Sequence, residues 1–158
     1  MEQPFFNILA AIHEAFQRPS AKAPMKSHDL YATKGNSSST SFDGIWTMRC
    51  GSFGCLDHEM RGGVLQVQAE RLFGGDSNFA YIGSGNVSRS ELSGWLDITR
   101  HSDDPAIACL WGTNERLYKL RLVAELVSPE HVEGRLLRSG YPDKHLTMRK
   151  LMPIITII

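Results

Sequence analysis

Apolar and polar residues alternate with a period of two through most of the chain after Gly44. The clearest example is residues 117–127, whose apolar positions are Tyr118, Leu120, Leu122, Ala124 and Leu126. Successive side chains of an extended strand point to opposite faces, so this segment buries one face and exposes the other. No proline interrupts the chain between Gly44 and Pro105, as hydrogen-bonded strands require. The pattern therefore predicts an all-β fold.

The same alternation recurs, more weakly in places, in eight further segments. They are residues 45–50, 64–70, 71–74, 79–84, 92–100, 107–111, 132–137 and 145–151. Short turns rich in Gly, Asn, Asp and Ser separate most of them, which favours pairing between strands that are neighbours in sequence. A lipocalin-like, up-and-down antiparallel barrel of about eight strands hides the edges of such a meander best, and a two-sheet sandwich is the alternative.

The alternation also predicts which side chains point into the barrel. The large ones are Trp46, Met48, Phe79, Tyr81, Leu120 and Leu122. They either line a cavity for one small hydrophobic ligand or fill the interior themselves, and we expect a filled interior. Small inward residues at Gly94, Ala124 and Gly134 would relieve crowding there. Trp95 lies on the opposite face of its segment, so it is predicted to stand on the outside.

The two ends of the chain depart from the strand pattern. Residues 1–42 are predicted to form an amphipathic helix and a flexible linker, residues 43–151 the barrel domain, and residues 152–158 an apolar tail. The tail is uncharged and rich in β-branched residues, a composition that aggregates when it is exposed. We hypothesise that the helix, the tail and Trp95 together form a homodimer or partner interface.

Charge and cysteine content exclude several classes of function. Seventeen Lys and Arg residues balance seventeen Asp and Glu residues, so no net positive field attracts nucleic acid or an anionic membrane. No apolar run approaches the roughly 18 residues of a membrane span, and the first residues lack the basic start of a secretory signal. Three cysteines are an odd number, which favours free thiols. We expect a cytoplasmic protein.

Two groups of residues carry the raw material of catalytic or metal chemistry. Cys50, Cys55 and His58 have the spacing C-x4-C-x2-H, and Cys109 or His101 would be needed to complete a zinc site. The spacing is wider than that of paired zinc knuckles, so incidental thiols in a hairpin loop are the expectation.

The second group is His101 with Asp103 and Asp104, which places an imidazole near carboxylates. These residues lie in a loop that ends at Pro105, where solvated charges are usual. We therefore expect no catalytic residues, no metal and no cofactor. A barrel enzyme that uses His101 or a cysteine is the third and last hypothesis, after a binding protein and a ligand carrier.

A series of spaced glycine motifs resembles those of a known family. The motifs are Gly44-Ile45-Trp46, Gly62-Gly63-Val64, Gly74-Gly75-Asp76-Ser77, Tyr81-Ile82-Gly83, Leu110-Trp111-Gly112, Gly134 and residues 146–151. Through them, residues 43–151 resemble the GrlR-like family of small bacterial proteins, whose best-known member is a negative regulator of type III secretion. The resemblance does not extend to the first 42 residues.

The resemblance implies a homodimeric, lipocalin-like barrel that is not an enzyme and that binds the transcriptional activator of the secretion genes. In the archetype of the family, an acidic run just after the fourth strand serves that partner. The matching stretch here is Ser88, Arg89, Ser90 and Glu91, which holds one acid and one base, so the acidic tetrad is absent. We expect these four residues and Trp95 to contact a protein partner.

Overall fold

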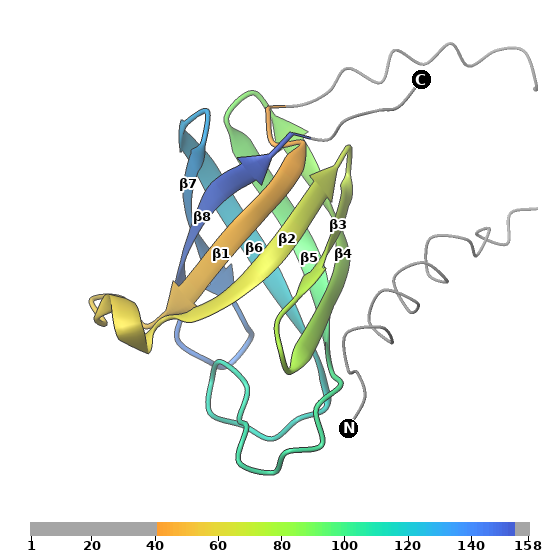
Figure 1. Ribbon diagram of the computed structural model, residues 1–158, viewed down its shortest axis with the longest axis vertical. Coiled ribbons are helices and arrows are strands. Elements are labelled where there is room, and N and C mark those ends of the chain that lie inside the picture. The colour runs from red at the N-terminus through yellow and green to blue at the C-terminus, as the bar shows by residue number, and fades with distance from the viewer. Residues whose placement is uncertain (1–40, 154–158) are drawn as a thin grey trace, which may run out of the picture. The chain divides into compact units, whose positions relative to one another are not determined.

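A computed structural model describes residues 41–153 of the chain, which form one closed antiparallel barrel (Figure 1). Each strand pairs with its neighbours in sequence, and the last strand pairs with the first. The strands are β1 (Gly44–Gly51), β2 (Arg61–Gln68), β3 (Arg71–Gly75), β4 (Phe79–Ser88), β5 (Glu91–Arg100), β6 (Leu117–Ser128), β7 (His131–Leu137) and β8 (Lys144–Met152). The predicted up-and-down barrel of about eight strands is confirmed. The predicted N-terminal helix and residues 154–158 of the tail lie outside the described residues.

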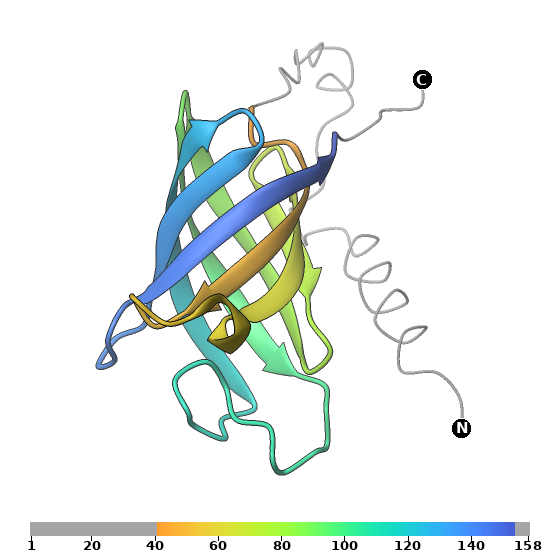
Figure 2. The ribbon, with the colours of Figure 1, turned by 60° about the vertical axis from the view of Figure 1, so that its left-hand side comes forward.

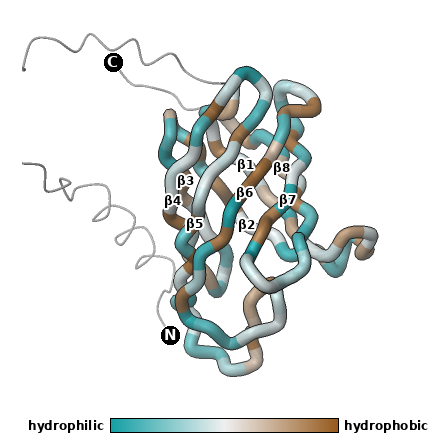
Figure 3. The backbone as a smooth tube through the Cα atoms, turned by 180° about the vertical axis from the view of Figure 1, so that it is seen from behind, coloured by the Kyte–Doolittle hydropathy of each residue, from teal (hydrophilic) through white to brown (hydrophobic). Residues whose placement is uncertain are grey.

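The interior of the barrel contains alternate residues of every strand. Trp46, Leu65, Leu72, Leu122 and Met148 are completely buried there. The tube in Figure 3 accordingly changes between hydrophobic and hydrophilic colours along the strands. The period-two pattern of the sequence therefore marks the two faces of the barrel wall.

Small inward residues allow the barrel to close without steric conflict. A methyl group at Gly134 would lie 2.4 Å from the main-chain oxygen of Val123 and 2.7 Å from Cβ of Ala124, its partner in the β6–β7 ladder. Real Cβ atoms do not approach other atoms so closely, so only glycine fits at this position, where β7 pairs with β6. Gly94 meets a similar restriction 2.6 Å from the oxygen of Ser84.

One predicted strand is wrong. Residues 107–111 belong to the loop between β5 and β6, which runs across one end of the barrel (Figure 2). The chain turns there because the Asp104 side chain accepts a hydrogen bond from the amide of Ala106, and because Gly112 adopts a φ of +78°. Ile107 and Trp111 are partly buried against the core, so their apolar character reflects packing over the barrel end and not strand pairing.

Arg138 anchors this loop to the barrel. Its guanidinium forms an ion pair with Glu115 and lies 4.4 Å from the ring centroid of Tyr118 and 4.3 Å from that of Tyr141. The Arg138 side chain is only 9% exposed. Cation–π contacts with desolvated rings contribute about 1–2 kcal/mol each, so this cluster holds the loop over one end of the barrel.

The opposite end is closed by residues just before β1. Phe42 is completely buried, and its main-chain oxygen accepts a hydrogen bond of 2.7 Å from Nε1 of Trp46. The ammonium of Lys150 lies 4.8 Å from the Trp46 ring centroid and donates to the main-chain oxygen of Ser41. Aromatic side chains therefore close both ends of the barrel.

Candidate functional site

The interior of the barrel holds almost no free space. The six side chains that were predicted to point inward are all buried, with none more than 8% exposed. Four of them, Met48, Phe79, Tyr81 and Leu120, line a cavity with a volume of about 30 Å³. That is room for one or two water molecules, whereas pockets for small organic ligands measure about 300–1,000 Å³.

The polar groups beside this cavity form hydrogen bonds that hold the local structure or are kept protonated by burial. Asp76 accepts hydrogen bonds from the amides of Asn78 and Phe79, at 2.7 and 2.8 Å, and from the hydroxyl of Tyr81. Burial, and after it the nearby charge of Asp76, raises the pKa of Tyr81, so this hydroxyl keeps its proton. Burial also raises the pKa of Cys50 to about 12. Neither group supplies a nucleophile or base at neutral pH.

The His101 dyad that the sequence suggested does not assemble. Nε2 of His101 lies 3.1 Å from the main-chain oxygen of Asp76. Asp103 instead forms an ion pair of 3.1 Å with Arg116, and Asp104 caps the turn at Ala106. His101 therefore fixes the turn between β3 and β4 to the loop between β5 and β6.

The cysteine and histidine spacing does not assemble a metal site either. Cys50 is buried inside the barrel, whereas Cys55 lies in the loop between β1 and β2 and His58 is exposed in the short 3-10 helix η2 (Asp57–Glu59). Across residues 41–153, no three His, Cys, Asp or Glu side chains are placed to hold a metal ion. That range also contains no helix with the length and apolar character of a membrane span.

Cys109 lies in an environment that favours its thiolate. Burial raises the pKa of this thiol, but hydrogen bonds from Thr113 and Trp111 and the charge of Arg138 outweigh burial and lower it. Sγ lies 3.0 Å from Oγ1 of Thr113 and accepts from the Trp111 amide at 3.4 Å. Because Cys109 is only 1% exposed, it anchors the loop and is closed to reagents.

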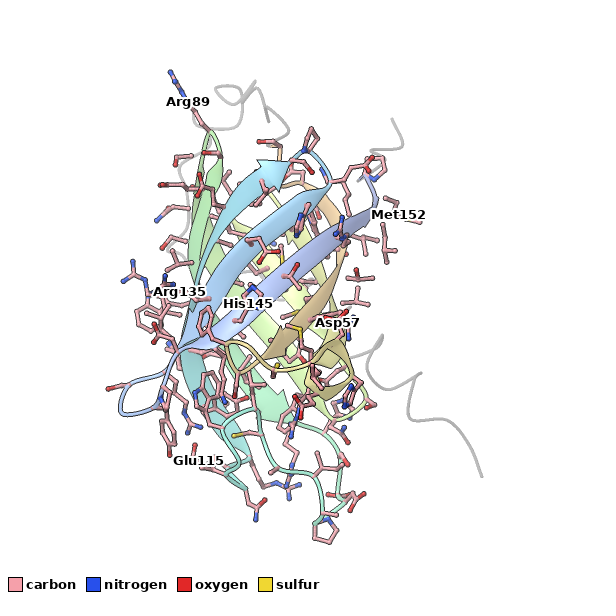
Figure 4. The ribbon with its side chains drawn as sticks, turned by 90° about the vertical axis from the view of Figure 1, so that its left-hand side faces the viewer. Asp57, Arg89, Glu115, Arg135, His145 and Met152 are labelled. Carbon is pink, nitrogen blue, oxygen red and sulfur yellow. The ribbon has the colours of Figure 1, made fainter. Side chains whose placement is uncertain are left out.

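The predicted partner residues lie along the hairpin of β4 and β5. Ser88 and Glu91 are paired at its end, and Arg89 at the tip of the turn points away from the barrel (Figure 4). Trp95 stands on the outer face of β5, as predicted, and is 54% exposed. The structure therefore places Glu91 and Trp95 on one face of one strand, four residues apart.

Three glutamates lie side by side on the outer surface. Glu91 of β5 is directly opposite Glu125 of β6, and Glu125 is directly opposite Glu133 of β7. We call this set the glutamate row. Within residues 41–153, neither Glu91 nor Glu125 forms an ion pair. Like charges directly opposite one another in a sheet are destabilising, so the row costs stability.

Two histidines bind the third member of the row. Nε2 of His131 lies 2.6 Å from one carboxylate oxygen of Glu133, and Nε2 of His145 lies 2.6 Å from the other. Partial burial alone raises the pKa of Glu133, but hydrogen bonds from His145, Thr147 and His131 outweigh it and lower the pKa. Since a carboxylate only accepts, each Nε2 carries the proton.

The glutamate row lies in an open trough on the outside of the barrel. Two adjoining hollows, of about 460 and 370 Å³, share Glu133 and His145. The first is bordered by the glutamate row and Phe53, and the second by Arg49, Asp57 and Arg149 of β1, η2 and β8. The ring of Phe53 stacks on His145 with 5.3 Å between centroids, so the loop between β1 and β2 forms one wall. Figure 4 shows Arg135 and His145 pointing outward from β7 and β8.

The trough cannot be read from the sequence alone. Glu91, Glu125 and Glu133 are separated by 34 and 8 positions, and only the register of β5, β6 and β7 makes them neighbours. A signal was present in the alternation, because these glutamates and His131 and His145 all occupy outward positions of their strands. The comparison with protein-family models finds no match to this chain, and the comparison with curated proteins finds none either.

Proposed function

We propose that this chain is a non-enzymatic regulatory protein that binds a basic protein partner on the outside of its barrel. The observation that carries the proposal is the trough with the glutamate row along one side. Three acids in register lower stability, and a surface that gives up stability in this way is explained by binding a positively charged partner.

The filled interior supports an external binding surface over a carrier function. A cavity of about 30 Å³ is roughly a tenth of the smallest ordinary ligand pocket. The polar groups that catalysis would need are engaged in turns and loop anchors. A packed barrel with solvent-accessible charged side chains is suited to recognising another macromolecule by its surface.

The partner that fits is a transcriptional activator of secretion genes, the partner that the GrlR-like resemblance implies. The acidic tetrad of that family is missing from residues 88–91, but Glu91 lies in that stretch and Glu125 and Glu133 are added to it by strand pairing. In this proposal the register of the barrel supplies the acids that the hairpin sequence lacks. The protein acts in the cytoplasm, as a homodimer.

Binding of the full-length chain to the purified activator tests the proposal. We expect the double variant Glu91→Gln/Glu125→Gln to weaken binding by about tenfold or more, because two of the three acids are lost, and wild-type binding to weaken steeply with salt. Glu70→Gln is the matched control, since Glu70 is an exposed acid in the turn between β2 and β3. Absence of binding, or equal binding by the double variant and the control, overturns the proposal. A lipid adduct in the native mass spectrum would instead favour the carrier.

A further inference from the structure

Two histidines connect the glutamate row to the arginines of the same trough. His131 lies on β7 and His145 on β8, and Nε2 of each lies 2.6 Å from an oxygen of Glu133. Each histidine also has an arginine as its direct partner in the β7–β8 ladder, Arg149 for His131 and Arg135 for His145 (Figure 4). Each imidazole therefore has one acidic and one basic neighbour.

The hydrogen bonds to Glu133 leave the second nitrogen of each ring available for another proton. Nε2 donates to the carboxylate, and within residues 41–153 Nδ1 of neither ring forms a hydrogen bond. The side chains are 21% exposed for His131 and 32% exposed for His145, so water reaches both. A proton can therefore add at Nδ1 without breaking a contact, and it converts each hydrogen bond to Glu133 into an ion pair.

The charge of the histidines acts on a neighbourhood that contains both signs. The charged residues that border the two hollows around them are Arg49, Asp57, Glu91, Glu125, Glu133, Arg135 and Arg149. Arg135 is paired with Asp143 at 3.7 Å and Arg49 with Asp57 at 3.9 Å. Within residues 41–153, Arg149 forms no ion pair. Neutral histidines therefore leave the glutamate row as the acidic side of the trough, whereas charged histidines place two further cations beside that row.

Histidine is the side chain whose charge ordinarily changes between pH 5 and pH 8. Two added protons would change the charge of the glutamate row and its histidines from three negative to one negative. Phe53 would tolerate the charge, because its ring already stacks on His145 with 5.3 Å between centroids, and an aromatic face attracts a cation. A modest change in pH can therefore alter the local charge of the trough while the fold stays the same.

We propose that His131 and His145 make the trough a pH-dependent site, which binds basic ligands at pH 7.5 and releases them as the pH falls toward 5.5. This inference rests on the proposed function, because it takes the glutamate row as the contact for the basic partner. With both imidazoles charged, Glu133 is neutralised and the two cations repel a third. At about 8 Å in water and low ionic strength, this repulsion weakens binding about fivefold for each ammonium group on the row.

Binding of octalysine to the full-length chain tests the switch. This peptide carries only ammonium side chains, which stay charged from pH 5.5 to pH 7.5. Isothermal titration calorimetry at an ionic strength of about 0.01 M should show binding that is at least about fivefold weaker at pH 5.5 than at pH 7.5. In His131→Gln/His145→Gln the difference should fall below about twofold. His58→Gln is the matched control, because His58 is exposed in η2 and borders neither hollow, and it should keep the wild-type difference.

The outcomes separate the switch from the proposed function. Equal affinity of the wild-type chain at both pH values overturns the switch and leaves the glutamate row as a binding surface, as does an undiminished difference in the double variant. No binding of octalysine at pH 7.5 overturns the glutamate row as a site for cations, and the switch with it.

Nuclear magnetic resonance of the ring nitrogens gives a second measurement that needs no ligand. The Nδ1 signals of His131 and His145, assigned with the single variants His131→Gln and His145→Gln, should each show the gain of a proton between pH 8 and pH 5.5. Rings that keep one protonation state over this whole range overturn the proposal.

Discussion

Replacing Glu125 by Gln should make the barrel more stable, although it removes a charged residue from the surface. Glu125 is directly opposite Glu91 on one side and Glu133 on the other. Two unit charges about 6 Å apart in water repel by about 0.7 kcal/mol, and the carboxylate of Glu133 accepts hydrogen bonds from His131 and His145, which reduces its share of the repulsion. Removing the central charge should therefore raise the free energy of unfolding by about 1 kcal/mol.

Urea denaturation at pH 7.5 in low salt measures this gain. A rise of about 1 kcal/mol corresponds to a rise in the melting temperature of about 4 °C for a domain of this size. In about 1 M NaCl the Debye length falls to about 3 Å, so most of the gain should disappear. Glu70→Gln removes the same charge outside the glutamate row and should stay within about 0.5 kcal/mol of wild type at both salt concentrations.

Two results would refute this reasoning. One is a loss of stability in Glu125→Gln, which would mean that the carboxylate makes a favourable contact. The other is a gain of equal size at low and high salt, which would assign the effect to packing or helix and strand propensity rather than to charge. A salt-dependent gain together with weaker partner binding would identify the glutamate row as a surface kept for binding at the expense of stability.

Four further predictions concern the packing and titration of the barrel. Gly134→Ala should lower the free energy of unfolding by about 2 kcal/mol or more, because the added methyl group meets the main chain of Val123, and urea denaturation measures it. Arg138→Gln should speed hydrogen exchange in residues 101–116 by freeing the loop, whereas exchange equal to wild type would contradict the anchoring role. The pKa of Glu133 is lowered from its ordinary value of 4.5. The ionised Glu133 carboxylate should therefore stabilise the fold above about pH 4.5, and this stabilisation should be lost as the pH falls through the lower pKa of the folded state. In Glu133→Gln, the free energy of unfolding should depend less on pH in that acid range. Iodoacetamide at pH 8 should label Cys55 before Cys50, whose thiol is buried and has a pKa of about 12, and mass spectrometry of digested samples gives the order.

The fold could be predicted because strand alternation is a local signal. In residues 117–127, the alternation alone predicts which side chains point inward and which point outward, and the burial pattern of β6 agrees with that prediction. Residues 107–111 show where the signal fails, because Ile107 and Trp111 are apolar for a different reason, namely that they cover the barrel end. Alternation reports burial of a side chain, and it does not state whether a neighbouring strand or a loop supplies that burial.

The glutamate row could not be predicted because register is not a local property. The neighbours of Glu125 depend on where the turns between β5, β6 and β7 place each strand, and a shift of one residue would turn a whole outer set inward. A strand was expected at residues 107–111, where the chain instead forms part of the loop between β5 and β6. An error of this kind changes the expected pairing of the strands that follow, so the sequence alone does not predict cross-strand neighbours such as Glu91 and Glu125.

The net charge of the chain also does not show how its acidic residues are distributed over the barrel surface. The whole chain carries no formal net charge, which argues against a general attraction to nucleic acid. Electrostatic fields at a surface are nevertheless set over distances of about 10 Å in physiological salt, so the net charge of the whole chain does not report the local contribution of three acids in register on adjacent strands. Interior substitutions away from the glutamate row, such as Leu72→Ala, and outer ones such as Glu125→Gln should therefore have separate effects: the first lowers stability and leaves the affinity of the folded protein for its partner unchanged, and the second raises stability and weakens binding. If the binding site lay inside the barrel instead, a substitution that changed the interior packing would alter both the stability and the affinity for the partner.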